Sequence, residues 1–95
     1  MIKINIKNNN INISGHALYD DYGKDIVCAS VSSIVICTIN GILALNNEVI
    51  EVDSTKGINI TILKENDTVK TLLKNMINLL KELETKYTGN IKINE

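Results

Sequence analysis

The sequence predicts an α+β fold, with one small domain over residues 1–95 in which a mostly antiparallel sheet packs against two helices. The chain has 95 residues, 44% of them hydrophobic, which suffices for one modest core. Short segments that alternate isoleucine with polar residues are typical of strands, and two longer segments carry apolar residues at helical spacing. The expected order is strand, strand, helix, strand, strand, helix, strand.

The N-terminal segment predicts a β-hairpin. Isoleucine alternates with polar residues from Ile2 to Ile6, and the alternation resumes at Ile11 and Ile13 after the turn-forming asparagines of residues 8–10. This segment has neither a cationic leader nor a continuous apolar stretch, so it does not resemble a signal peptide. We therefore expect a cytoplasmic protein.

A helix is predicted from Asp25, a good N-cap residue, to about Leu45. The preceding residues 14–24 have the composition of an exposed loop. One arc of the helix is expected to be buried, comprising Val27, Val31, Ile34, Val35, Thr38, Ile42 and Leu45. The opposite side carries a stripe of small side chains that could pack against another backbone or face water, namely Ser30, Ser33, Cys37, Asn40, Gly41 and Ala44.

The C-terminal half predicts two more strands, a second helix and a last strand. The two strands are expected over residues 48–53 and 58–62. Asp67 is predicted to cap a helix that ends near Tyr87, and residues 91–93 form the last strand. The expected buried face of this second helix consists of Val69, Leu72, Leu73, Met76, Leu80, Leu83 and Tyr87.

The composition argues against a nucleic-acid or membrane partner. The formal net charge is -1 and basic residues do not cluster in the sequence, so the electrostatic signature of a nucleic-acid binder is missing. Three tyrosines, with no tryptophan or phenylalanine, offer few surfaces on which bases could stack.

The two cysteines indicate a reducing compartment and no metal or other cofactor. Cys28 and Cys37 are nine positions apart, which in a helix places them on opposite sides and about 13 Å apart along the axis. They cannot form a disulfide with each other within that helix. One histidine and two cysteines so arranged also make a poor zinc site, because structural zinc needs four convergent ligands.

His16 and Cys28 together have the parts of a cysteine hydrolase. With Asp25 as N-cap, Cys28 occupies the third helical position, where free backbone N–H groups and the helix dipole stabilise a thiolate. An imidazole in reach can take the thiol proton. Asp25 and Ser32 lie on the same side of the helix as Cys28 and could orient His16 or bind substrate.

Structural interpretations of the same residues stay open at this point. Cys28 could be a buried structural thiol, and His16 a solvated loop residue. Asp25 could serve only as a cap, and Ser32 could only bond the carbonyl of Cys28.

The whole pattern, however, resembles a known signature. It consists of Gly15-His16-Ala17, then Gly23, then residues 25–32 with the sequence Asp-Ile-Val-Cys-Ala-Ser-Val-Ser. This pattern resembles that of the ribosomal-processing cysteine protease family, Prp, and the chain length and element order extend the resemblance over the whole protein. Ser30 stands where the family more often has alanine or another small residue, which affects no catalytic position.

The resemblance implies a function and a set of roles. Members of the family remove a short N-terminal extension from protein twenty-seven of the large ribosomal subunit. By the motif match Cys28 is the nucleophile and His16 the general base and acid. Asp25 and Ser32 take the acidic and hydroxyl positions of the motif, and Gly15, Ala17 and Gly23 complete the site.

Several further expectations accompany this hypothesis. The resemblance implies a homodimer, which the small and apolar circumference of the first helix also favours. Backbone N–H groups at the start of that helix, including that of Cys28, are expected to stabilise the oxyanion. The loop over residues 16–24 is expected to be weakly ordered until a peptide binds.

Two other functions remain as alternatives to a protease. The first is a non-enzymatic, ribosome-associated interaction protein, in which Cys28 would be dispensable. The second is a thiol redox sensor, although Cys37 points away from Cys28 and no resolving partner is evident.

Overall fold

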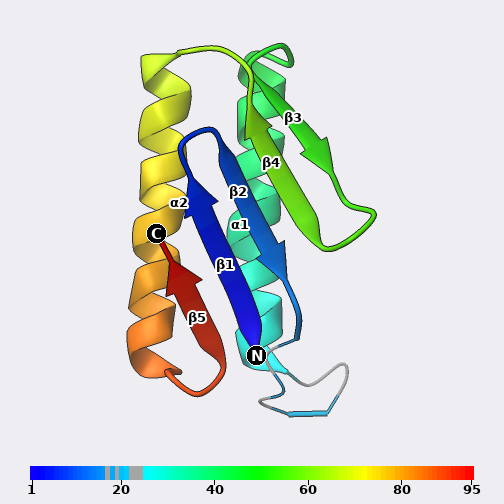
Figure 1. Cartoon of the computed structure of the whole chain (residues 1–95), viewed down its shortest axis with the longest axis vertical. Coiled ribbons are helices and arrows are strands. Elements are labelled where there is room, and N and C mark those ends of the chain that lie inside the picture. The colour runs from blue at the N-terminus through cyan, green and yellow to red at the C-terminus, as the bar shows by residue number, and fades with distance from the viewer. Residues whose placement is uncertain (17, 19, 22–24) are drawn as a thin grey trace.

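The computed structural model describes residues 1–16, 18, 20–21 and 25–95, and it has the predicted element order. Figure 1 shows a sheet with both helices on one of its faces. The elements are β1 (Ile2–Lys7), β2 (Asn10–Ser14), α1 (Ile26–Leu45), β3 (Ile50–Asp53), β4 (Ile58–Ile62), α2 (Asp67–Lys86) and β5 (Ile91–Asn94).

The five strands form one mixed sheet in the order β3-β4-β2-β1-β5. Three of its pairings are antiparallel, and only β1 and β5 run parallel. The parallel pairing follows from the connection through α2, which returns the chain to the edge of the sheet beside its first strand (Figure 1). The prediction of a mostly antiparallel sheet under two helices is confirmed.

The core is a single aliphatic layer between the sheet and the helices. Alternate residues of the strands face this layer, and the helices contribute one stripe each. All fully buried side chains in the described part of the chain are apolar. The layer comprises Ile2, Ile4, Ile11, Ile13, Val27, Val31, Val35, Ile39, Ile42, Val49, Ile50, Ile60, Val69, Leu73, Met76, Leu80 and Ile91.

The predicted bounds of α1 are correct, but its buried stripe differs from the predicted arc. Ile39 is buried, whereas Ile34 and Thr38 are only half-buried. Leu45 is 65% exposed, because it is the last residue of the helix and extends past the layer. From Val27 to Ile39 every fourth residue of α1 is buried. Ile39 therefore faces the core, and Thr38 lies to one side of the buried stripe.

The N-cap of α2 was predicted one residue too late. Asn66, not Asp67, has the extended cap conformation, and its side chain accepts a hydrogen bond from the Val69 N–H at 3.1 Å. Asp67 lies in the first turn, where its negative charge interacts favourably with the positive end of the helix dipole. The helix ends at Lys86, and Tyr87 is its C-cap.

Two strand boundaries also move by one or two residues. β3 begins at Ile50 rather than Glu48, because the Glu48 N–H donates to the Asn46 side chain at 2.9 Å and so belongs to the turn. Asn10, expected in the first turn, is the first residue of β2 and pairs with Lys7.

The assignment of Asn66 as the N-cap of α2 can be tested through protein stability. Asn66→Ala is expected to lower the free energy of unfolding by about 1 kcal/mol, because the Val69 N–H loses its acceptor. Asp67→Ala should lower it by only about 0.3 kcal/mol, through the helix dipole. Urea denaturation of both variants measures the difference. A larger loss for Asp67→Ala would show that Asp67 is the cap.

Candidate active site

The start of α1 is fixed by one carboxylate. Asp25 adopts an extended conformation, with φ of -79° and ψ of 99°, and its Oδ1 accepts hydrogen bonds from the N–H groups of Val27 and Cys28 at 3.0 and 2.9 Å. The predicted role of Asp25 as N-cap is therefore confirmed. Because the helix begins at Ile26, Cys28 is its third residue and lies in the first turn.

The thiol of Cys28 belongs to a half-buried residue that packs at the edge of the core. It lines a cavity of about 540 Å³ together with His16 and Ser32. Among the described residues, the others that line it are Leu18, Asp20, Asp25 and Ala29. The structure thus gathers His16, Asp25, Cys28 and Ser32, the four polar residues that the sequence predicted for the site, around one space.

His16 enters this cavity from the end of β2, and Gly15 lets it do so. Gly15 has a φ of +87°, and a Cβ there would lie 2.4 Å from the Met1 carbonyl oxygen. Only glycine fits this combination of backbone conformation and close approach. A Cβ on Gly57, which lies in the β3–β4 turn with a φ of +73°, would come equally close to the Ile13 carbonyl oxygen. Backbone therefore packs closely at Gly15, just after β2, and against Ile13 within β2, the strand that leads to His16.

Ala17 and Gly23, the other two predicted site residues, lie outside the described residues. The expectation that residues 16–24 order only on peptide binding falls largely on that segment as well. It stays a prediction.

Three lining residues were not predicted from the sequence. Asp20 contributes a second carboxylate beside Asp25, Ala29 follows the cysteine, and Leu18 adds an apolar side chain that is 78% exposed. Leu18 has a φ of +55°, an uncommon conformation for leucine. The helical position of Ala29 next to Cys28 was a signal in the sequence, whereas the placement of Leu18 and Asp20 depends on the path of the loop.

The expected oxyanion role of the Cys28 N–H does not fit this geometry. That N–H donates to Asp25 Oδ1, as does the N–H of Val27. Two of the donors in the first turn are therefore engaged by the cap, and a developing oxyanion would have to compete with a carboxylate for them.

The remaining side chains on α1 clarify the structural alternatives. Cys37 is exposed, and both thiols are free, as the helical spacing predicted. Ser30 makes the kind of bond that was considered for Ser32: its hydroxyl donates to the carbonyl of Ile26, four residues earlier in α1, at 2.6 Å. Ser32 is exposed and faces the cavity.

Comparison with known proteins places this chain in a family. The family model described as cysteine protease Prp matches residues 1–92. The chain belongs to the cysteine protease Prp family. It is 34% identical over 98 residues to the ribosomal processing cysteine protease Prp of Mycoplasma genitalium, a match that covers all of this chain and 96% of that protein. The Prp of Staphylococcus aureus is 31% identical over 86 residues, covering 86% of this chain and 81% of that protein.

Solved structures agree with the sequence comparison. The fold is similar to that of S. aureus Prp in complex with a covalently linked product peptide, with a TM-score of 0.85 and 29% identity. That match covers 98% of this chain and 95% of the other. A second S. aureus Prp structure, in complex with a substrate peptide, gives a TM-score of 0.78.

The chain is therefore a cysteine protease of the ribosomal-processing Prp family. The alternative of a non-enzymatic interaction protein is therefore wrong. A cysteine protease needs a nucleophilic thiol, and Cys28 lines the cavity at the start of α1.

Proposed function

We propose that this Prp family member cleaves peptides with Cys28 as nucleophile and His16 as general base and acid. One observation carries the assignment: the thiol in the first turn of α1 and the only histidine of the chain line the same cavity. The positive end of the α1 dipole stabilises a thiolate at this position. Cys37, the other thiol, is exposed further along α1 and lines none of this cavity.

The reaction follows from these two groups. The Cys28 thiolate attacks the scissile carbonyl carbon, and the imidazolium of His16 gives its proton to the leaving amine as the C–N bond breaks. The neutral imidazole then takes a proton from water, whose oxygen attacks the thioester and releases the acid product and the Cys28 thiolate, so the thiolate and the imidazolium are both regenerated. S. aureus Prp carrying a covalently linked product peptide supports a covalent route.

Asp25 and Ser32 are proposed to support this chemistry. The Asp25 carboxylate positions Cys28 by holding its backbone N–H, and it also lines the cavity. The exposed hydroxyl of Ser32 lies on the same side of α1, one turn further along. Both residues are thus placed to contact a bound peptide or to orient the imidazole.

The proposed substrate is the N-terminal extension of protein twenty-seven of the large ribosomal subunit. The names of the relatives support ribosomal processing, and S. aureus Prp has been solved with a substrate peptide. The resemblance of the Gly15-to-Ser32 pattern to the family signature extends that substrate to this chain. We place the reaction in the cytoplasm, where ribosomal proteins are made.

The nucleophile is tested by replacing each cysteine in turn. Cys28→Ala and Cys28→Ser should abolish cleavage, because no other thiol lines the cavity, whereas Cys37→Ser should cleave at nearly the normal rate. The measurement is the mass of the extended ribosomal protein before and after incubation. Normal cleavage by the folded Cys28→Ala protein would rule out the assignment. A Cys28 that alkylates rapidly in a protein that never cleaves would instead indicate the redox sensor.

The base is tested through both turnover and thiol reactivity. His16→Ala should lower turnover by about a hundredfold or more, because both proton transfers lose their carrier. It should also slow the alkylation of Cys28 by iodoacetamide near neutral pH. An alkylation rate that follows pH in the same way with and without His16 would show that the imidazole and the thiol do not interact.

We also propose that the working unit is a homodimer formed through the outer face of α1. By length and composition α1 could even cross a membrane, since its mean hydropathy is 2.2 over an 18-residue window of which only 28% is buried. Its buried stripe shows instead that it is the core helix of this fold. Ile36 and Leu43 remain 49% and 36% exposed beside the small side chains of Cys37, Gly41 and Ala44. A two-fold pair covers such a surface with two copies of itself.

Light scattering at micromolar concentrations tests the dimer. The native protein should have the mass of two chains, and Ile36→Glu should give the mass of one, because the new charge would be buried between the helices. Leu63→Glu is the matched control, since Leu63 is 52% exposed but lies outside α1, and it should leave the dimer intact. A mass of one chain for the native protein at all concentrations would contradict the proposal.

A further inference from the structure

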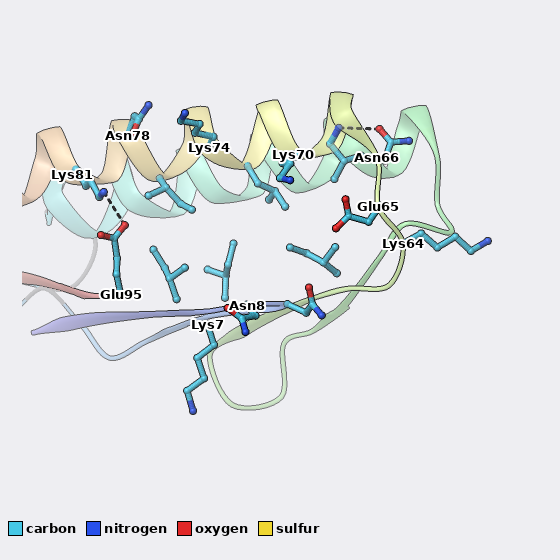
Figure 2. Close-up of a pocket in the computed structure, with 17 residues that line it drawn as sticks. Lys7, Asn8, Lys64, Glu65, Asn66, Lys70, Lys74, Asn78, Lys81 and Glu95 are labelled. Carbon is cyan, nitrogen blue, oxygen red and sulfur yellow. Dashed lines mark hydrogen bonds and ion pairs between the residues drawn. The ribbon is translucent and has the colours of Figure 1, made fainter.

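A second concave surface lies between α2 and the sheet, and we call it the lysine groove. Its floor has six aliphatic side chains, three from strands and three from α2: Ile6, Ile11, Ile62, Val69, Leu73 and Ile77. Figure 2 shows unlabelled apolar side chains between the helix and the strands, with the labelled polar residues around them. The cavity volume is about 380 Å³, within the range of small-molecule sites.

The lysine groove is separate from the active site. It shares none of its lining residues with the cavity of Cys28, and it opens beside the β1–β2 turn, at the end of β2 remote from His16. An occupant of the groove therefore does not need to touch the catalytic residues. The inference is independent of the proposed protease mechanism.

The rim of the groove concentrates positive charge on a chain whose net charge is -1. Five of the ten basic residues line it, with only two of the eleven acidic residues. Lys81 pairs with Glu95 at 2.8 Å, and Lys64 pairs with Glu48 at 3.4 Å. Lys70 and Lys74, both on the α2 side in Figure 2, form no ion pair with any residue that the structure describes. They are available to an anion.

The apolar floor of the groove favours a hydrocarbon chain over a peptide. Val69, Leu73 and Ile77 lie within α2, and Ile11 lies on β2, which pairs with strands on both sides, so backbone N–H and C=O groups there are already bonded. A peptide lying on this floor would leave its own amide groups without partners, which is costly away from water. A hydrocarbon chain makes no such demand. It buries apolar surface mainly against the three floor side chains that are only partly buried, Ile6, Ile62 and Ile77, because the other three already belong to the core.

We propose that the lysine groove binds a single-chain anionic amphiphile, a fatty acid of medium length, with its chain on the aliphatic floor and its carboxylate at Lys70 and Lys74. The aliphatic floor supplies affinity for the chain, and the two ammonium groups discriminate an anionic head from a neutral or cationic one.

The test is isothermal titration of the full-length protein with dodecanoate below its critical micelle concentration. Dodecanol and dodecyltrimethylammonium serve as neutral and cationic probes of equal chain length. Dodecanoate should bind saturably with one site per chain and at least about tenfold more tightly than either probe. Amide chemical shifts in nuclear magnetic resonance spectra should change at Ile6, Ile11, Leu73 and Ile77.

Matched variants locate the site. Lys70→Glu combined with Lys74→Glu should weaken dodecanoate binding by about tenfold or more, while peptide cleavage stays unchanged. Lys3→Glu combined with Lys56→Glu makes the same charge change outside the groove and should leave binding unaltered. Equal affinity for all three probes, shift changes confined to α1, or binding only to phosphatidylglycerol vesicles and not to free dodecanoate would each overturn the proposal.

Discussion

The structure depends on one aliphatic layer between the sheet and the two helices. With no phenylalanine or tryptophan in the chain, this layer is built from isoleucine, valine, leucine and one methionine. Branched aliphatic side chains interlock closely, so the two helices are held at fixed positions over the strands. This packing also fixes the position of Cys28, because Val27 and Val31, which flank it in α1, are both buried in the layer.

Within this frame, the Asp25 carboxylate connects the loop to the helix. It holds the N–H groups of Val27 and Cys28, so one side chain sets both the start of α1 and the placement of the thiol. The same bonds occupy donors that a helix start would otherwise offer to an oxyanion. A capped helix thus gains stability at the expense of donors, and the dipole remains as its contribution to a thiolate.

Local patterns predicted the elements well and their details less well. The isoleucine alternation and the cap at Asp25 placed β1, β2 and α1, because neighbouring residues determine these features. The cap of α2 was wrong by one residue, since Asn66 and Asp67 are both good capping residues and only the path of the chain from β4 decides between them. The parallel pairing of β1 with β5 is a contact between opposite ends of the chain, and no local pattern specifies it.

The site shows the same division between local and long-range information. Helical spacing alone brings Asp25, Cys28 and Ser32 to one side of α1. His16 was predicted as the only histidine of the chain, close in sequence to the start of that helix, and the family resemblance supported its role. Leu18 and Asp20 line the cavity through the course of the loop, which composition does not encode. The special role of Gly15 appears only in the structure, because the Met1 carbonyl that excludes a side chain there is brought close by the pairing of β1 with β2.

The two helices differ in a way that bears on how the molecule meets its surroundings. α2 has one apolar face and mostly charged or polar residues elsewhere, with Leu79 as an exposed exception, as expected for a helix between core and water. α1 is apolar on its buried stripe and also small or apolar on its outer face, including Ile36 and Leu43. Burial in this domain accounts for only one of those two faces. The second face lies on the helix that carries Cys28, so the proposed dimer would contact the same element that positions the proposed nucleophile.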